Sequence, residues 1–376
     1  MKKLIFKNII FEILVFLLLA LFSLTMIIWV IQAVNFLDLV SEDGHSFNIY
    51  FKFSLLSIPK ILSRILIFVL FISIFFIISK YEENNEILIL WTNGINKLQL
   101  INVVLIFSTI LIIIQLFLNS FIVPKSLDLG RKFIRSSGIE LFPSLLKEKK
   151  FIDTVSDLTI FIDEKKNNGK FKKIFLKDQF DEKNSQIIIA KEGSIQSKND
   201  KYYLVLKNGR MINLEEKNTN IIEFSKTELN LSTYSTKTTT FPKIQEIDSP
   251  EVIKCLNSFY RYNKTYSKRN FVCDYSSIKA VTKEFFRRFI NPFYIILVSF
   301  ISTCLVFKSK DERNYFRYKY FLFSLGIVAI VLSEISSEYL NFESLLSSIL
   351  IFLPFLLSLL IYVIMIKKTM QNINLK

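Results

Sequence analysis

Few residues in this chain have the types and spacing that catalysis or metal binding needs. His45 is the one histidine, and the cysteines are Cys255, Cys273 and Cys304. Zinc sites need several Cys or His ligands at close spacing, so this inventory predicts no metal site. A Ser-His-Asp triad would have to be assembled around His45 from separate domains, and the chain has no Walker-type phosphate loop. We therefore expect no catalytic residue and no cofactor here, and any ATP to be bound by a partner.

The cysteines leave one structural question open. Cys304 lies inside an apolar run, whereas Cys255 and Cys273 lie in the long polar block of the chain. In an oxidising compartment these two can form a disulfide. Two unpaired thiols are an equally good interpretation.

The segment 80–97 is the strongest candidate for a functional element. Its pattern predicts a short helix, because Asn84 or Asn85 suits the N-cap, Glu86 suits the first turn and Gly94 can adopt the left-handed conformation that ends a helix. A helix with these caps needs no neighbouring element to define its ends.

One face of this short helix is apolar and includes a tryptophan. Ile87, Leu90 and Trp91 fall at i, i+3 and i+4. An amphipathic helix lying on the inner membrane surface is one interpretation, and a docking helix for a cytoplasmic partner is the other. A helix on an anionic membrane is normally rich in lysine, whereas this one begins with glutamates, which favours protein docking.

The elements that position this segment are long apolar runs. About 20 apolar residues cross a hydrocarbon core of about 30 Å as a helix. Three such runs precede a polar block of the chain and three follow it. We predict six membrane-spanning helices, at 13–34, 53–79, 98–123, 289–307, 320–339 and 344–366.

Charged residues lie near the ends of two spans. Lys60 and Arg64 lie in the second span, and Lys52 just precedes it. These three cations are candidates for contacts with lipid phosphates, although snorkelling to the interface is the simpler interpretation. Glu334 in the fifth span, about one turn from Glu338, is either a functional intramembrane carboxylate or a solvated acid at the interface.

Lysine and arginine in the short loops determine the predicted orientation. Basic residues near span ends stay on the cytoplasmic side, which predicts cytoplasmic termini and an external block at 124–286. The first run is too long for a signal peptide and lacks a small-residue cleavage pattern, so we expect it to remain as the first span. The net charge of +15 is mostly topological, and we expect no nucleic-acid partner.

The external block has the short alternating segments of an all-β domain. Six strands are predicted at 158–163, 172–178, 186–191, 202–206, 210–214 and 221–231. Turns are predicted at 167–169, 192–194 and 207–210, the last from the type I′ signal Asn208-Gly209. The predicted fold class is an α-helical membrane protein with an inserted β-sandwich or jelly roll.

Several motifs together resemble one known family. Glu86-Ile-Leu-Ile-Leu-Trp-Thr-Asn-Gly94-Ile95 resembles the Glu-(x)7-Gly-Ile signature of the LptF/LptG (YjgP/YjgQ) lipopolysaccharide-export permeases. The segments 174–178, 187–193 and 204–209 are similar to strands of that family's periplasmic jelly roll. The segment 284–292 is similar to the start of its fourth span, and Pro354 to the proline of its sixth.

This resemblance implies an organisation and a set of partners. It implies spans one to three at 1–123 with an ATPase-coupling helix at 82–94, a periplasmic β-jelly-roll at 124–286, and spans four to six at 287–376 in a bacterial inner membrane. Two related permeases pair in this family, and a dimer of cytoplasmic ABC ATPase subunits drives them. Glu86, Trp91 and Gly94 are the expected coupling residues.

The implied function is extraction of lipopolysaccharide from the outer leaflet of the inner membrane and its transfer to a periplasmic jelly-roll protein. The alternatives are an ATPase-coupled mechanotransmission protein and a membrane-anchored scaffold, neither of which moves lipid. The acidic loop 38–45 favours the LptF-like side of the family. Candidate inward-facing residues on the lipid path are Ile174, Leu176, Ile187, Ile189, Leu204, Leu206 and Phe224.

Overall fold

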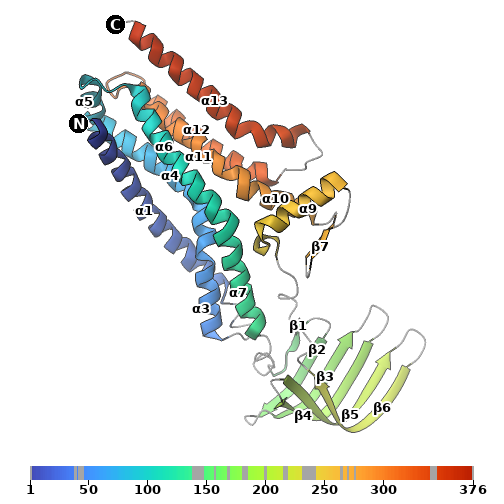
Figure 1. Ribbon diagram of the computed structural model, residues 1–376. Coiled ribbons are helices and arrows are strands. Elements are labelled where there is room, and N and C mark those ends of the chain that lie inside the picture. The colour runs from blue at the N-terminus through green and yellow to red at the C-terminus, as the bar shows by residue number, and fades with distance from the viewer. Residues whose placement is uncertain are drawn as a thin grey trace. The chain divides into compact units, whose positions relative to one another are not determined.

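Six stretches of helix in the described residues are long and apolar enough to cross a membrane, as the apolar runs predict. The computed structural model (Figure 1) describes every residue except 1, 38–39, 41–45, 138–147, 156–157, 167–169, 180–184, 199–200, 215–218, 231–242, 263–265, 269–270, 275–276, 339–344 and 375–376. His45 and nearly all of the acidic loop lie outside the described residues.

The chain divides into two units. The helical unit comprises Met1–Val30, Ser57–Leu127 and Lys243–Lys376, and the β-unit comprises Ile31–Leu56 and Asp128–Pro242. Each unit has a buried apolar cluster of its own.

Span one is a single helix, whereas spans two and three are each built from several helical segments. Span one is α1 (Lys2–Asn35); span two is α3 (Phe47–Leu56) and α4 (Ile58–Glu83); span three is α6 (Lys97–Phe117), the π-helical turn η1 (Leu118–Ile122) and α7 (Val123–Ser137). The break before α4 coincides with Pro59 in its first turn, where the missing N–H of proline is tolerated. The short helix α5 (Glu86–Thr92) connects spans two and three.

The last three spans follow a small connector region. Span four is α10 (Ile278–Phe285), η4 (Phe286–Ile290), η5 (Asn291–Phe293), α11 (Tyr294–Thr303) and η6 (Cys304–Phe307); span five is α12 (Tyr315–Glu338); span six is α13 (Leu345–Asn374). The connector comprises η3 (Ile244–Glu246), α9 (Ser249–Tyr262), β7 (Tyr266–Lys268) and β8 (Phe271–Cys273).

Helix α11 lies at the centre of the helical unit. It contacts α4, α6, α12 and α13 (Figure 1), and nearly all of its residues are buried. Ser108 of α6 and Ser299 of α11 share a buried hydrogen bond of 2.7 Å. Spans two and four are mostly buried in the unit, whereas spans one, five and six leave most of their apolar surface uncovered.

The inserted β-domain is one antiparallel sheet of consecutive hairpins. Its strands pair in the order of the chain: β1 (Phe151–Val155), β2 (Leu158–Lys166), β3 (Lys170–Gln179), β4 (Ser185–Lys198), β5 (Lys201–Leu214) and β6 (Thr219–Asn230). The predicted all-β insertion is confirmed. In the described residues these six strands form one sheet, and β7 pairs with β8 in a separate two-stranded sheet.

Two predicted turns are wrong. Segments 192–194 and 207–210 lie inside the long strands β4 and β5, so the two strands predicted at 202–206 and 210–214 are one. The turn predicted at 167–169 lies outside the described residues, between strands that pair as far as Lys166 and Lys170.

A crease across the sheet explains both errors. In each of the four ladders from β2–β3 to β5–β6, one residue pair is missing from the register. The missing positions lie side by side across the sheet, one on each strand: Asp163, Lys173, Lys191, Asn208 and Ser225. Two of them have left-handed backbones, with φ of 51° at Lys173 and 52° at Asn208. The register is the same on both sides of each skipped pair, so these four ladders contain no β-bulge there; instead, the strands turn one extra residue outward, which shifts their alternation.

The shift of alternation lets one sheet enclose a core. In β4 the buried residues are Ile188 and Ala190 before the crease but Gly193 after it. Gly193 has no room for a side chain, since a Cβ would lie 2.3 Å from Cδ1 of Ile174. Both halves of the sheet therefore face the same apolar cluster, as the two sheets of a sandwich do.

Candidate functional site

Helix α5 has the caps of an independent element. It begins at Glu86 and ends at Thr92, and Gly94 has φ of 72°. The N–H of Gly94 bonds the carbonyl of Trp91 (3.1 Å) and the N–H of Ile95 bonds the carbonyl of Leu90 (3.1 Å). This pair of bonds is the Schellman motif, and Ile95 is buried beneath it.

The start of α5 differs in detail from the prediction. Asn85 is the N-cap, but it has φ of 62° and its side chain makes no capping hydrogen bond. Asn84 instead donates from Nδ2 to Oε1 of Glu86 at 3.1 Å. The glutamate is thus held beside the first turn of the helix.

The two faces of α5 have different roles. Ile87 and Leu90 are buried in the core of the helical unit, and Trp91 packs against that core with Nζ of Lys97 5.7 Å from its ring centroid. Leu88 and Ile89 are both 56% exposed. The tryptophan face therefore anchors the helix, and the face with Leu88 and Ile89 is the one available to a partner.

A groove separates α5 from the first turns of α1. It has a volume of about 720 Å³ and is lined by Lys7 and Phe11 of α1 and by Glu86 and Ile89 of α5. Tyr81 of α4 also lines it and donates a 3.0 Å hydrogen bond to Glu12 of α1, which ties α1 to α4 beside the groove. The groove has an apolar floor with one cation and one carboxylate on opposite walls.

The sequence-predicted cations are divided between the two units. Lys60 and Arg64 of α4 line a cavity of about 20 Å³ together with Arg287 and Glu284. A cavity of this size holds about one water, so a lipid phosphate does not fit it as it stands. Lys52 belongs to the β-unit, where its Nζ lies 5.3 Å from the ring centroid of Phe133.

The fully buried cation of that neighbourhood is Arg288. It donates to Oε1 of Glu284 (2.9 Å), to the carbonyl of Ile247 (2.8 Å), to Oγ of Ser249 (3.0 Å) and to the carbonyl of Gln245 (3.1 Å). A buried charge needs such partners to offset its lost hydration. Arg288 thus joins the connector to the start of span four.

The acids of span five have separate surroundings. Glu334 is exposed, and Glu338 forms an ion pair with Lys283 of α10. The exposure of Glu334 fits the interpretation of a solvated acid better than that of a buried functional carboxylate.

Most of the lipid-path candidates lie on the inner face of the sheet. Ile174, Leu176, Leu204 and Leu206 belong to its buried cluster, and Phe224 packs against them. The prediction was wrong for Ile187 and Ile189, which lie on the other face because Ile188 and Ala190 supply the inward positions of β4. Ile189 is 47% exposed and lines an open groove of about 880 Å³ with Phe161 and Phe175.

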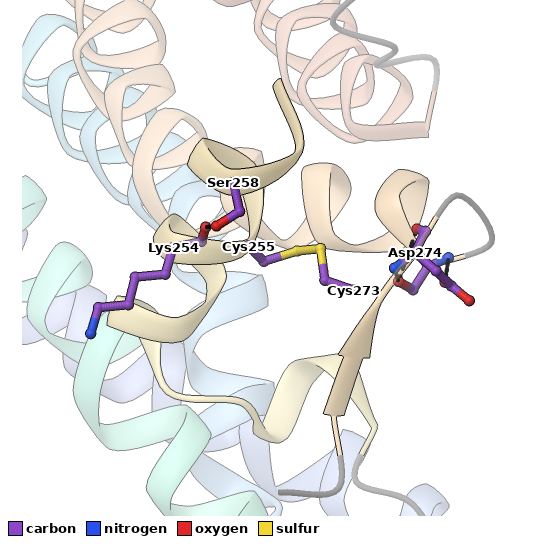
Figure 2. The surroundings of a disulfide bond; sticks show 6 residues. Lys254, Cys255, Ser258, Cys273 and Asp274 are labelled. Atoms are coloured by element: carbon purple, nitrogen blue, oxygen red, sulfur yellow. Dashed lines mark hydrogen bonds between the residues drawn. A yellow bond between two sulfur atoms is a disulfide. The ribbon is translucent and has the colours of Figure 1, made fainter. Parts of the chain in front are cut away.

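A disulfide cross-links two elements of the connector. Figure 2 shows Cys255 of α9 bonded to Cys273 of β8, with Lys254 pointing away from the bond. Both cysteines are fully buried among Val252, Val281 and neighbouring side chains. The structure resolves the question that the sequence left open.

No group of three or more metal-ligating side chains occurs in the part of the chain that the structure describes.

Comparison with known proteins agrees with this arrangement. Residues 7–368 match the family described as Lipopolysaccharide export system permease LptF/LptG. The chain belongs to this family. It is also similar to Uncharacterized protein RP871 of Rickettsia prowazekii (strain Madrid E), with 26% identity over 197 residues, which is 52% of this chain and 52% of that protein. The matched region spans about half the length of that relative.

The description of the family names a lipopolysaccharide export permease. Sequence reasoning missed two features of the site. One is the exposed pair Leu88 and Ile89, which the helical period already places opposite Ile87 and Leu90. The other is a set of contacts between the end of α4 and span five, made across more than 220 residues of chain.

Proposed function

We propose that this LptF/LptG-family chain is the membrane permease of an ATP-driven machine that extracts lipopolysaccharide from the outer leaflet of the inner membrane. It would pass the lipid to a periplasmic jelly-roll protein on the way to the outer membrane. A second six-span permease and a dimer of cytoplasmic ABC ATPase subunits complete the machine, and ATP is bound by those subunits.

The observation that carries this proposal is the anchored helix α5 with its open face. Glu86, Leu88 and Ile89 present one carboxylate beside two exposed apolar side chains, next to the groove against α1. A partner with a basic side chain and an apolar pocket complements this face. The buried Ile87 and Leu90 transmit force from such a partner into the spans.

The β-unit supports the lipid part of the proposal. Moving acyl chains out of a membrane costs about 0.8 kcal/mol for each CH₂ group that becomes exposed, so the chains need an apolar slot to receive them. The inner face of the creased sheet is apolar along β2 to β5. Opening of the sheet about its crease would expose that face to an acyl chain.

The uncovered helices support the partner assignments. Spans one and five expose many apolar side chains within the helical unit. In the proposed assembly these spans line the cavity shared with the second permease, where lipid enters sideways. Membrane lipids cover the remaining apolar surface.

The disulfide supports the proposed orientation. Structural disulfides persist in the periplasm and are rare in the cytoplasm, so a Cys255–Cys273 bond favours a periplasmic connector. With that orientation both termini and α5 lie in the cytoplasm, in a multi-pass inner-membrane protein.

The test is purification of the tagged full-length protein from its native cell in mild detergent, followed by native mass spectrometry. Glu86→Arg replaces this partly exposed carboxylate with a positive charge, which would repel a basic side chain of the partner, and we expect the ATPase to be lost. Glu192→Arg makes the same charge change on an exposed residue of β4 and is the matched control.

The outcomes separate the candidate functions. Wild type and Glu192→Arg should retain an ATPase pair, a second permease and a lipopolysaccharide, whereas Glu86→Arg should retain no ATPase. An ATPase without any lipid would favour mechanotransmission instead. A chain that is purified alone would overturn the proposal in favour of a scaffold.

A further inference from the structure

The end of span two is bound to the start of span five by residues that lie outside the exposed face of α5 with Leu88 and Ile89. Glu82 and Glu83 are the last two residues of α4, directly before α5. Oε1 of Glu82 accepts a 2.8 Å hydrogen bond from the backbone N–H of Lys310, in the turn before α12. Nζ of Lys310 donates to the carbonyl of Glu83 at 2.9 Å, and Nζ of Lys319 on α12 lies 2.7 Å from Oε1 of Glu83.

These four residues, Glu82, Glu83, Lys310 and Lys319, form what we name the α4–α12 joint. Glu82 is only 7% exposed, so its carboxylate depends on the hydrogen bond that it accepts. The pair Glu83–Lys319 is more exposed and contributes less. The joint therefore has one buried contact and one auxiliary ion pair.

The turn that carries Lys310 holds its own shape. The N–H of Ser309 bonds Oε1 of Glu312 (3.2 Å), and the N–H of Tyr315 bonds the carbonyl of Glu312 (2.9 Å). Tyr318 donates its hydroxyl to the carbonyl of Cys304 at 2.9 Å, which fixes α12 to the end of span four. A displacement at Lys310 is thus passed on rather than absorbed in the turn.

On the other side of the joint, only two residues separate α4 from α5. The N–H of Asn84 bonds the carbonyl of Lys80 (3.0 Å), and the N–H of Asn85 bonds the carbonyl of Glu82 (3.1 Å). These bonds restrict the conformational freedom of the segment between α5 and the joint.

Span five also packs closely on span two beyond the joint. The ring of Phe323 lies 5.7 Å from that of Phe71 and 5.3 Å from that of Phe75. A Cβ on Gly326 would lie 2.2 Å from the ring of Phe71, so the two helices approach as closely as a glycine permits. The contact is continuous from the joint into the span.

We propose that the α4–α12 joint passes a displacement of α5 to span five, and that Glu82, Glu83, Lys310 and Lys319 are positioning residues for coupling. This inference rests on the proposed function, because it assigns the displacement to the bound ATPase. It identifies which span moves first with the docking helix, and it requires that the joint be intact for ATP hydrolysis to release lipid.

The experiment uses the complete complex in lipid nanodiscs loaded with purified lipopolysaccharide. It measures ATPase retention, ATP hydrolysis and lipopolysaccharide released per ATP. Glu83→Lys and Lys319→Glu each place like charges at the ion pair, and each should lower release per ATP roughly two- to five-fold with the ATPase retained. The combined variant restores opposite charges and should recover at least half of the lost release.

Glu82 supplies the stronger test. Glu82→Leu leaves the N–H of Lys310 without its acceptor and should lower release per ATP roughly ten-fold, whereas Glu82→Gln keeps an acceptor oxygen and should remain near wild type. Arg317→Glu makes the same charge change as Lys319→Glu on an exposed position of α12 and should not alter the ratio.

The two proposals fail in different ways. Loss of the ATPase from wild type overturns the proposed function itself. An ATPase that is retained in every variant, with an unchanged release per ATP in Glu82→Leu and in both charge reversals, overturns the joint alone. Lower stability of these variants with an unchanged ratio also overturns it, because a merely structural contact would behave in that way.

Discussion

In the residues that the structure describes, the helical unit and the β-unit each contain an Asn-Gly pair, and the backbone uses these two pairs differently. Asn93-Gly94 ends α5, and there the glycine adopts φ of 72°, while a Cβ added to it would meet no atom within 4 Å. Asn208-Gly209 lies inside β5, and there the asparagine adopts the left-handed φ of 52°. Gly209 serves a different purpose, since a Cβ would lie 2.4 Å from the carbonyl oxygen of Ile189.

The difference teaches that one dipeptide can satisfy two physical requirements. At Gly94 the requirement is conformational, because only glycine and asparagine adopt a left-handed backbone at low cost. At Gly209 it is steric, because the neighbouring strand and the ring of Phe224 occupy the space of a side chain. A side chain at Gly94 should therefore cost only backbone strain, whereas a side chain at Gly209 should clash with its neighbours.

The largest effect is expected for Gly209→Ala. The clash involves a backbone oxygen, so β4 and β5 must move apart, at a cost of about 2–3 kcal/mol. Hydrogen exchange of the β4 and β5 amides in the full-length protein should accelerate roughly 30- to 160-fold. Asn208→Gly is the control, since it keeps the left-handed backbone accessible and adds no atom. Exchange at the wild-type rate in Gly209→Ala would show that space is not what this glycine provides.

A smaller effect is expected at the other pair. Gly94→Ala puts an alanine into a left-handed backbone with no clash, at a cost of about 1 kcal/mol. Exchange of the α5 amides should accelerate roughly five-fold, and that of β5 should not change. Gly94→Asn should stay close to wild type. A loss of α5 protection in Gly94→Asn as large as in Gly94→Ala would contradict a purely conformational role.

The same contrast explains which parts of the structure the sequence could predict. The spans and α5 depend on local features: long apolar runs, a first-turn glutamate and a glycine at the C-terminal end. The Asn208-Gly209 signal is local too, but the ladders with β4 and β6 on both sides of it keep the strand continuous. Rules based on local sequence could not predict this continuity, since they contain no information on which strands pair with one another.

The assignment of side chains to faces failed for a related reason. Alternation predicts which residues of a strand share a face but not which face is inside, and the crease changes that phase partway along β4. Ile187 and Ile189 were therefore placed inside, although Ile188 and Ala190 are the buried residues. The α4–α12 joint was out of reach because Glu82 and Lys310 are joined only by the packing of spans two and five.

The smallest effect is expected from the ion pair at the crease. Asp163 and Lys173 occupy skipped positions of neighbouring strands, and Oδ2 of Asp163 lies 2.8 Å from Nζ of Lys173. The hydrogen bond from Lys173 lowers the pKa of the Asp163 carboxyl below its ordinary 3.8, and the same bond raises the pKa of Lys173 above its ordinary 10.5. Lys173 is exposed and Asp163 is partly exposed, so the pair should stabilise the crease only slightly.

The pH dependence of this pair follows from the signs of the two shifts. The carboxyl contributes stability above its unfolded pKa and loses it as pH falls through the lower folded value; the ammonium contributes below its unfolded pKa and loses it as pH rises through the higher folded value. The contribution is therefore full between about pH 4 and pH 10. Hydrogen exchange of the β2 and β3 amides in wild type and Asp163→Asn, compared at each pH so that intrinsic rates cancel, should differ slightly at pH 7 and converge as the pH falls through the lowered folded-state pKa of Asp163. If Asp163→Asn accelerated exchange as much as Gly209→Ala does, the ion pair, and not the backbone of Asn208-Gly209, would be the main stabiliser of the crease.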